Sequence, residues 1–169
     1  MLYTDSTRGR PCAKDPAVVR FNNKYYMYYS LPPYPSEKWH SKKPNGWNIG
    51  IAISNDLEKW EKVGEIAPAM KYEIKGLCAP GAIVIDEKLH LFYQNYGNFP
   101  HDAICHAISK DGINFVRDAS NPIFSPSGSW NNGRAIDADV AVKDDKLFLY
   151  TATRDPHGKY KNCVWLLRV

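Results

Sequence analysis

Short runs of apolar and aromatic residues, separated by polar pairs, follow one another along this chain, and one such pattern occurs three times. Residues 15–30, 79–94 and 137–152 align without gaps, at offsets of 64 and 58 residues. Each segment has a β-branched or aromatic run, a polar dipeptide and a second apolar run. Runs of this kind around a two-residue turn predict a β-hairpin. The turns are Asn22-Asn23, Asp86-Glu87 and Asp144-Asp145, residue types that tolerate the positive φ of tight hairpin turns.

A second motif extends the first two hairpins. Residues 52–56 match residues 107–111, and both contain a Ser-x-Asp pair that we expect to shape a turn between a third and a fourth strand. Each unit then holds about four strands in roughly 60 residues, somewhat more than the roughly 40–50 of common propeller repeats. The sequence therefore predicts an all-β fold, a β-propeller of four-stranded antiparallel blades.

The number of repeats predicts a partial propeller with about two and a half to three blades, because closed rings need roughly 4–8. We expect a single domain over residues 1–169. Blade 1 spans about 10–70, blade 2 about 74–128, and an incomplete blade 3 about 130–169.

Composition excludes several partners. The net charge is +4, and the basic residues are scattered, with no run longer than Lys42-Lys43, which argues against nucleic acid. No apolar stretch reaches the roughly 18 residues of a membrane span, and no signal peptide is visible. The four cysteines lack the C-x-x-C spacing of zinc sites, so we expect no metal ligands among them.

Antiparallel topology predicts which segments share a face. The starts of first strands, the ends of second strands and the starts of third strands lie at one end of each blade, and the polar hairpin turns lie at the other. The first end collects segments 10–15, 76–79 and 130–137, together with loops 31–48, 95–102 and 154–161. Binding residues concentrate on loops held by a rigid scaffold, so this end is the candidate functional face.

Asp15 and Asp137 occupy equivalent positions at the starts of first strands, which line the channel of a propeller. Neighbouring acids raise each other's pKa, which is how glycoside hydrolases divide the roles of acid and base. The alternative is that both carboxylates cap strands or bind a structural cation.

Further candidates on this face could contact a sugar. Arg154 ends a second strand and could hold a sugar hydroxyl or a substrate carboxylate, or pair with Asp155 or Asp139. Loop tryptophans could stack on sugar rings, although at least one is expected to pack under its loop. The candidate substrate-binding residues are Arg154, Trp130, Arg134, Gln94, Asn95, His101 and Trp39.

The order and spacing of these motifs resemble a known family. Residues 14–19 (KDPAVV) followed by 24–30 (KYYMYYS) resemble the opening blade of glycoside hydrolase family 43, whose relatives, including family 117, share a five-bladed propeller. Residues 79–81 (APG) resemble the start of its second blade, and residues 134–139 (RAIDAD) the start of its third. The likeness covers nearly the whole chain.

The resemblance implies roles for the two acids. Asp15 would be the general base that activates water, and Asp137 would tune the pKa of the general acid, in a reaction that inverts the anomeric centre. The acid of that family is a Glu at the fourth blade, expected beyond Val169, so we expect this chain to be a truncated part of a longer enzyme. Substrates would be plant or algal polysaccharides, and location periplasmic or secreted. No cofactor is required, although a structural Ca²⁺ could fill the channel.

Two other functions compete with the hydrolase. A non-catalytic carbohydrate-binding propeller would keep Trp39, Trp47, Trp130 and Arg154 without needing Asp15, and an inactive remnant would need no ligand. An open partial propeller exposes strand edges and apolar faces, so we also expect self-association through these edges.

Overall fold

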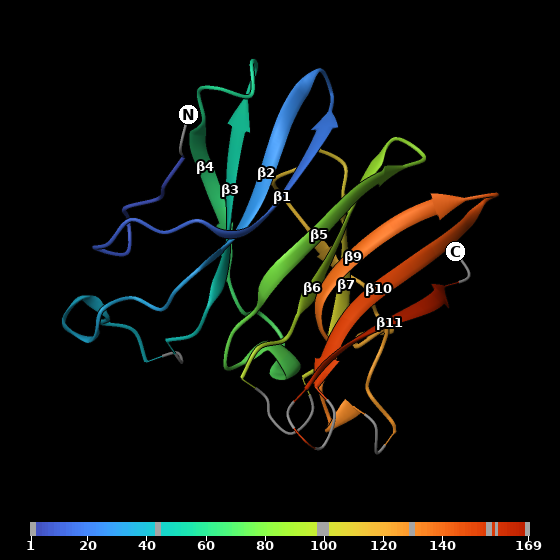
Figure 1. Ribbon diagram of the computed structural model, residues 1–169. Helices are drawn as coiled ribbons and strands as arrows, with labels where there is room; N and C mark the ends of the chain where they lie inside the picture. Colours follow the sequence, from blue (N-terminus) through green and yellow to red (C-terminus); the bar gives the residue numbers. More distant parts are fainter. Residues whose placement is uncertain are drawn as a thin grey trace.

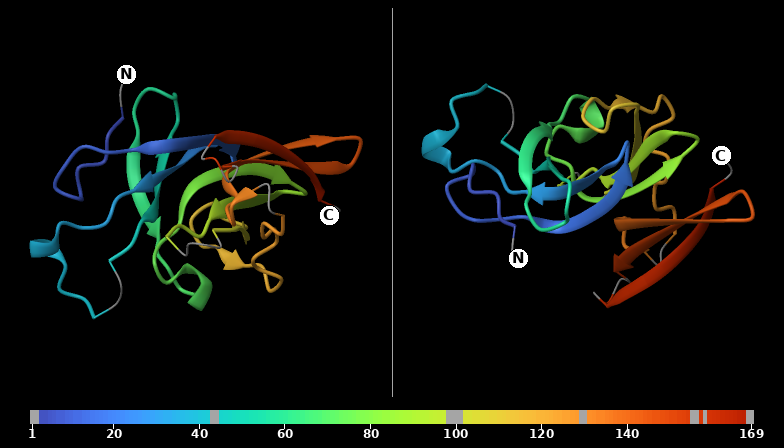
Figure 2. Two further views of the ribbon diagram at one scale, coloured as in Figure 1. Left: turned by 60° about the horizontal axis from the view of Figure 1, so that its bottom comes forward. Right: turned by 90° about the horizontal axis from the view of Figure 1, so that it is seen from above.

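The chain folds into three antiparallel sheets that follow one another like the blades of a fan (Figure 1). The computed structural model describes residues 3–42, 45–97, 102–128, 131–154, 157 and 159–167. The turned views in Figure 2 show the same succession, from the blue and teal sheet through the green and yellow sheet to the orange and red sheet. The predicted all-β fold of antiparallel propeller blades is confirmed.

The strands follow the chain order within each sheet. The first sheet has the order β1-β2-β3-β4, with β1 Lys14–Phe21, β2 Lys24–Leu31, β3 Asn48–Ser54 and β4 Glu61–Ile66. The second has the order β5-β6-β7-β8, with β5 Cys78–Ile85, β6 Lys88–Gln94, β7 Ile104–Ser109 and β8 Val116–Arg117. The third has β9 Ile136–Lys143, β10 Lys146–Arg154 and β11 Tyr160–Leu167, in the order β11-β10-β9.

Helical structure in the described residues is limited to two 3₁₀ turns, η1 Ser36–Lys38 and η2 Lys71–Glu73. Neither of these turns has the length or apolar character needed to cross a membrane.

The turns have the predicted backbone. All six residues of the three hairpin dipeptides have positive φ, between 47° and 61°. The Ser-x-Asp pairs also form matching turns: Ser54 and Ser109 each accept backbone N–H donors through Oγ, and Asp56 and Asp111 each accept two more through Oδ1. The Ser-x-Asp motif therefore shapes a turn, as expected.

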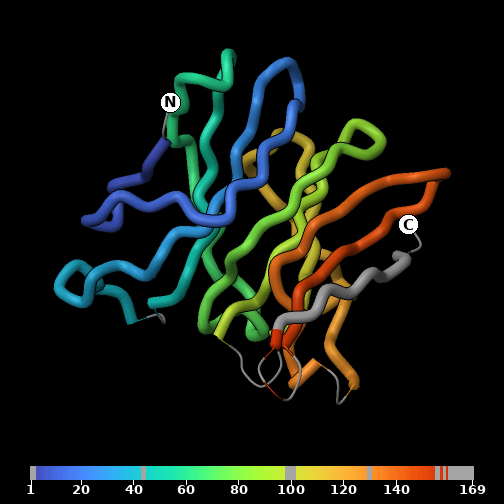
Figure 3. Tube along the Cα trace, in the orientation of Figure 1, coloured from blue at the N-terminus to red at the C-terminus, as the bar shows by residue number. Residues whose placement is uncertain are grey.

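The blades pack through apolar residues on alternate positions of their strands. Tyr28, Ile51 and Leu91 belong to a buried cluster between the first and second sheets, and Phe92 and Leu149 to another between the second and third. The inner strand β5 packs between β1 and β9 (Figure 3). Burial of these side chains at roughly 25 cal/mol per Å² is the main force that holds one blade on the next.

Neighbouring blades are also tied by matching backbone bridges. The N–H of Leu77 donates to the carbonyl of Trp47 at 2.9 Å, and the N–H of Ala135 donates to the carbonyl of Asp102 at 2.9 Å. Each bridge joins the segment before a third strand to the segment before the first strand of the next blade. The two bridges fix the ends of β5 and β9 on the predicted functional face.

Candidate functional site

The first strand of every blade begins with the same backbone distortion. Asp15, Ala79 and Asp137 have φ of 51°, 48° and 53°, and the pairing of each first strand with the second shifts register at this point. Positive φ is uncommon for residues other than glycine and costs free energy, and such strain clusters at functional sites. The sequence repeat is therefore also a repeat of backbone conformation. At this position the positive φ interrupts the regular alternation of side chains along the strand.

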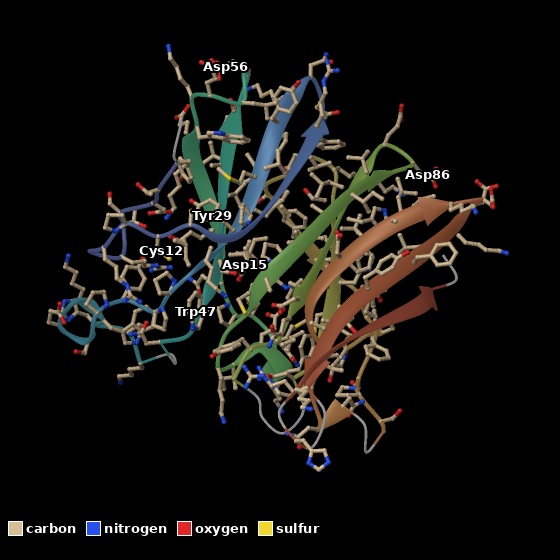
Figure 4. The ribbon with its side chains drawn as sticks, in the orientation of Figure 1. Cys12, Asp15, Tyr29, Trp47, Asp56 and Asp86 are labelled. Atoms are coloured by element: carbon tan, nitrogen blue, oxygen red, sulfur yellow. The ribbon has the colours of Figure 1, made fainter. Side chains whose placement is uncertain are left out.

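The three distortions meet at a shallow hollow of about 320 Å³, the axial hollow. Figure 4 labels Asp15 close to the start of β1, beside β5. The lining brings together the two carboxylates that the sequence predicts for the site, from blades 1 and 3, with blade 2 between them: Asp15, Pro16, Ala17, Ala79, Pro80, Gly81, Asp137, Ala138 and Asp139.

Asp15 is held by two donors. Its Oδ2 accepts from Ser30 Oγ at 3.1 Å and lies 3.1 Å from Lys14 Nζ. The fully buried Ser30 Oγ in turn accepts the N–H of Ala79 at 2.8 Å. One hydroxyl therefore orients the carboxylate of blade 1 and binds it to the strained residue of blade 2.

Asp137 is the group in this hollow whose protonation is perturbed. Although the residue as a whole is exposed, loss of water around its carboxyl raises its pKa, and the negative charge of Asp15 raises it further. Lys14 and Arg134 act in the opposite direction. The two acids thus interact electrostatically, as carboxylates sharing a cleft do.

A second polar network lies beside the hollow. Arg134 binds Asp102 Oδ2 through Nε and Nη2, both at 2.8 Å, and Gln94 Nε2 donates to the same oxygen at 3.4 Å. The buried Cys78 thiol lies 3.9 Å from Gln94 Oε1, and burial, followed by the charge of Asp15, raises the pKa of this thiol. Asp102 thereby positions two of the predicted substrate-binding residues.

Asn95, Trp39 and Arg154 are not among the residues that line the axial hollow. Asn95 is buried, and its Oδ1 accepts the N–H of Ala103 at 2.6 Å, which closes its loop. Trp39 stacks on Tyr34, with ring centroids 5.5 Å apart. Arg154 ends β10 and is half-buried. His101 and Trp130 lie outside the described residues.

Sequence reasoning missed three members of this site: Lys14, Ser30 and Asp102. All three could have been found from the topology, because they begin a first strand, end a second strand and precede a third strand on the functional face. Over the part of the chain that the structure describes, no three His, Cys, Asp or Glu side chains converge on a point that could hold a metal ion.

Comparison with known proteins relates this chain to the glycoside hydrolases that have a β-propeller fold. The family model described as "Glycosyl hydrolases family 32 N-terminal domain" matches residues 13–166. The family model therefore names family 32, and not family 43 as the sequence motifs implied. The strand motifs that carried the resemblance belong to a fold that the two families share.

Solved structures agree on the fold. A sucrose-6-phosphate hydrolase from Lactobacillus gasseri has a TM-score of 0.77 at 16% identity, over 92% of this chain and 32% of that one. A family 32 β-fructofuranosidase from Bombyx mori has 0.73 at 20%, over 92% and 32%. A family 117 glycoside hydrolase from Zobellia galactanivorans has 0.73 at 19%, over 93% and 52%. The chain thus spans about a third to a half of the length of these proteins.

Proposed function

Because this chain belongs to the glycosyl hydrolase family 32 N-terminal domains, we propose that it carries two carboxylates of a glycosidase active site. One observation carries this proposal: Asp15 and Asp137, from blades 1 and 3, line one hollow through the same backbone distortion. Ala79 of blade 2 has the same distortion without a carboxylate, so the support comes from the meeting of two carboxylates in one hollow and not from the strain itself.

Asp15 is suited to act at the anomeric centre. Its Oδ2 is occupied by Ser30 and Lys14, which fixes the carboxylate and directs the other oxygen to the substrate or to a water. Asp137 adds a negative charge close by, and such a charge keeps the pKa of a neighbouring acid high enough for it to donate a proton. Among the described residues, none of the glutamates lines this hollow, and the proposal places the general acid on a further blade.

The stereochemical course depends on what Asp15 does. As a general base it would activate water across a gap of roughly 6.5–9.5 Å between the two catalytic carboxyls and invert the anomer, which is the course that the likeness to family 43 implies. As a nucleophile, at roughly 5–5.5 Å from the acid, it would retain the anomer. NMR of the first-formed product distinguishes the two roles: the inverted anomer supports the base, and the retained anomer makes Asp15 the nucleophile.

The substrate class follows from the family. The family 32 structure from Bombyx mori is a β-fructofuranosidase, and a variant of it was solved in complex with sucrose. We therefore place fructofuranosides first, ahead of arabinose-, xylose- or galactose-containing polysaccharides. Arg134, whose charge acts on Asp137, and Gln94, which shares Asp102 with Arg134, are the first of the proposed substrate-binding residues. The further ones are Asn95, Trp39, Arg154, His101 and Trp130, and the proposal also admits a structural Ca²⁺ in the channel.

Turnover by acid-replaced variants tests the proposal. Aryl β-fructofuranosides, other aryl glycosides and sucrose would be supplied to this chain and to a polypeptide that continues it through further blades. An aryl leaving group needs little help from an acid, so Asp15→Asn should remove most of any activity in either form. Asp137→Asn should lower it less, by roughly 10²–10⁴-fold on sucrose, where acid assistance matters.

The control is Asp86→Asn, at an exposed hairpin turn on the opposite end of blade 2, where Asn accepts the same positive φ (Figure 4). Activity unchanged in Asp15→Asn would contradict the proposal. Saturable sugar binding without turnover in every form would favour a carbohydrate-binding module instead.

A further inference from the structure

The segment before β1 contributes to a second candidate site, which is made of different residues from those around the two acids. Asp5 and Cys12 exchange two backbone hydrogen bonds, at 3.1 and 3.0 Å, and close a loop around Gly9, whose φ is 80°. This loop lies beside the segment that leads from β2 into η1 in Figures 1 and 2. A Cβ built on Gly9 would lie 3.2 Å from Lys38 Nζ and 3.5 Å from Pro35 Cγ, so the two segments touch.

A hollow of about 460 Å³, the N-terminal hollow, lies at this contact. It is lined by Arg8, Gly9, Arg10, Pro33, Tyr34 and Pro35. None of these residues lines the axial hollow that holds Asp15 and Asp137.

Arg8 is the unusual group in the wall. Its side chain is only 1% exposed, and its guanidinium lies 3.5 Å from the centre of the Tyr34 ring. Nη2 pairs with Glu65 at 2.5 Å, but Nε and Nη1 have no hydrogen-bond partner in the described structure. A buried donor without an acceptor costs about 1–3 kcal/mol, and more when the group is charged. The guanidinium of Arg8 therefore lacks acceptors for two of its nitrogens.

The two arginines that line the hollow are cationic, and the acids closest to Arg8 are already paired. Glu65 also binds Lys62 at 2.5 Å, and Lys62 binds Asp5 at 2.8 Å, so both nearby acids have cationic partners. Arg10 is exposed on the rim, and Lys38 lies across Gly9 from it. Among the described residues, no carboxylate lies within ion-pair distance of Arg10 or Lys38.

Tyr34 joins this hollow to a second, mainly apolar one. The apolar hollow, of about 330 Å³, is lined by Tyr34, Trp39, Ala67, Pro68, Met70 and Ile74 among others. The backbone of Tyr34 is fixed on both sides, because its N–H donates to Asn45 Oδ1 at 2.9 Å and its carbonyl accepts from Asn45 Nδ2 at 2.7 Å. The stacked rings of Tyr34 and Trp39 thus provide a fixed aromatic wall beside a cationic pocket.

We propose that these two hollows together bind an acidic saccharide, with its anionic group at Arg10 and Lys38, beside the buried charge of Arg8, and a sugar ring against the aromatic pair of Tyr34 and Trp39. Charged hydrogen bonds from guanidinium groups to carboxylate or sulfate are the strong ones in proteins. Apolar pocket walls with a few placed polar groups are typical of small-ligand sites. The site shares Trp39 with the substrate-binding residues proposed above, but it requires no hydrolysis and neither of the two acids.

Calorimetric titration with four probes tests the proposal: sodium glucuronate, glucose 6-sulfate, neutral glucose and inorganic sulfate. We expect saturable binding of both acidic sugars, at least roughly tenfold tighter than that of neutral glucose, with affinity that falls as salt rises. Inorganic sulfate should bind more weakly than glucose 6-sulfate. Equal affinity for these two would overturn the assignment to a saccharide.

Variants at the rim avoid the risk that a change of the buried Arg8 prevents folding. Arg10→Gln with Lys38→Gln should weaken acidic sugars by roughly tenfold or more. Trp39→Ala should weaken the sugars but leave inorganic sulfate unchanged. The charge-matched control is Arg20→Gln with Lys24→Gln, two exposed residues at the far end of blade 1, which should leave binding unchanged.

Two outcomes would overturn the proposal: no saturable binding of either acidic sugar at millimolar concentration, or wild-type affinity in the rim variant. Asp15→Asn should bind acidic sugars as the wild type does. Failure of the hydrolase proposal would therefore leave this one standing, and the reverse also holds.

Discussion

The two interfaces between blades are built differently, although the strands on both sides repeat. In the described residues, the cluster between blades 1 and 2 holds twelve buried residues, and the cluster between blades 2 and 3 holds six. The first interface is also tied by polar groups: Tyr28 Oη donates to the carbonyl of Gly112 at 2.8 Å, and Tyr26 Oη to that of Asp111 at 3.1 Å. The second interface is tied by polar groups of another kind, namely the ion pair of Arg134 with the buried Asp102 and the backbone bridge from Ala135 to Asp102, beside a smaller apolar cluster that includes Leu149.

The outward faces of the fan differ as well. Tyr3 and Ala13 pack on the outward side of blade 1, around Tyr29. On blade 3, Tyr150 is 42% exposed and Val142 is 49% exposed. Val18 on blade 1 is also 49% exposed, so both ends of the fan offer apolar surface for the self-association that we expect through open blade edges.

This difference matters for the site because each interface positions one acid. Asp15 is locked to blade 2 by Ser30 and Ala79, across the larger interface. Asp137 depends on how blade 3 sits on blade 2, across the smaller one. We therefore expect that Asp15 is rigidly placed and that the position of Asp137 responds to changes in packing.

The largest expected effect is at Glu73, in the segment that links blade 1 to blade 2 and that Glu73 fastens onto blade 2. Its buried carboxylate accepts from Arg117 Nε at 2.9 Å, from Tyr93 Oη at 2.5 Å and from the N–H of Ala69 at 2.8 Å. Glu73→Ala leaves the buried Arg117 without its partner and should cost about 3–5 kcal/mol of unfolding free energy. Urea denaturation measures this cost, with the exposed Lys71→Ala as control. A loss below 1 kcal/mol would contradict the account that a buried ion pair holds the linker between blades 1 and 2 on blade 2.

Leu149→Ala tests the smaller interface. Leu149 is fully buried against blade 2, so its truncation leaves a cavity and should cost about 2–4 kcal/mol. Tyr150→Ala is the matched control, because the adjacent side chain faces away from blade 2 and should cost roughly 1 kcal/mol or less. Equal losses in the two variants, measured by urea denaturation, would show that blade 3 does not pack as described.

Ser30→Ala removes the hydroxyl that joins Asp15 to Ala79. The unfolding free energy should fall by about 1–2 kcal/mol, because the buried N–H of Ala79 loses its acceptor. Amide hydrogen exchange at Ala79 should accelerate, which a general loss of stability alone would spread over the whole blade. The exposed Ser36→Ala is the control, and unchanged exchange at Ala79 would show that this hydroxyl is dispensable.

A smaller effect concerns pH and the two stacked histidines of blade 2. His90 Nδ1 lies 3.0 Å from His106 Nε2, and His106 Nδ1 lies 3.0 Å from Asp118 Oδ2. Burial, then the neighbouring His106, lowers the pKa of His90 below its ordinary 6.5. The unfolded chain therefore binds more protons, so stability is complete above about pH 6.5 and declines as the pH falls below it.

Melting temperatures at pH 7.5 and pH 5.5 measure this effect. The wild type should melt at a lower temperature at pH 5.5, and His90→Phe should reduce the difference between the two values. His40→Gln, an exposed site, serves as control. An undiminished difference in His90→Phe would place the titrating group elsewhere.

The sequence predicts the strands and the equivalent positions of Asp15 and Asp137 well, and the contacts between blades poorly. Hairpin dipeptides such as Asn22-Asn23 are local signals, because positive φ depends on the residue itself. The equivalence of Asp15 and Asp137 follows from the repeat alone. Ser30 and Asp102 were missed because their partners, Ala79 and Arg134, belong to the next blade, and the packing of one blade on another is not encoded in any short window.

The family assignment also separates what short motifs reveal from what they do not. The motif at residues 14–19 reports the opening blade of a propeller hydrolase, which families 32 and 43 share, so sequence reasoning reached the group and not the member. The acidic-saccharide site was invisible for a further reason. Arg8 and Tyr34 are 26 residues apart, and only the packing of two loops brings them together.

The most direct test of the account is whether Asp15 and Asp137 form one electrostatic unit across three blades. Carboxyl-detected NMR titration would follow Asp137 in the wild type and in Asp15→Asn. The account predicts a raised pKa for Asp137 in the wild type and a lower one in the variant, still above the ordinary 3.8 because burial remains the larger cause. An Asp137 pKa that does not change when the charge of Asp15 is removed would contradict a shared site.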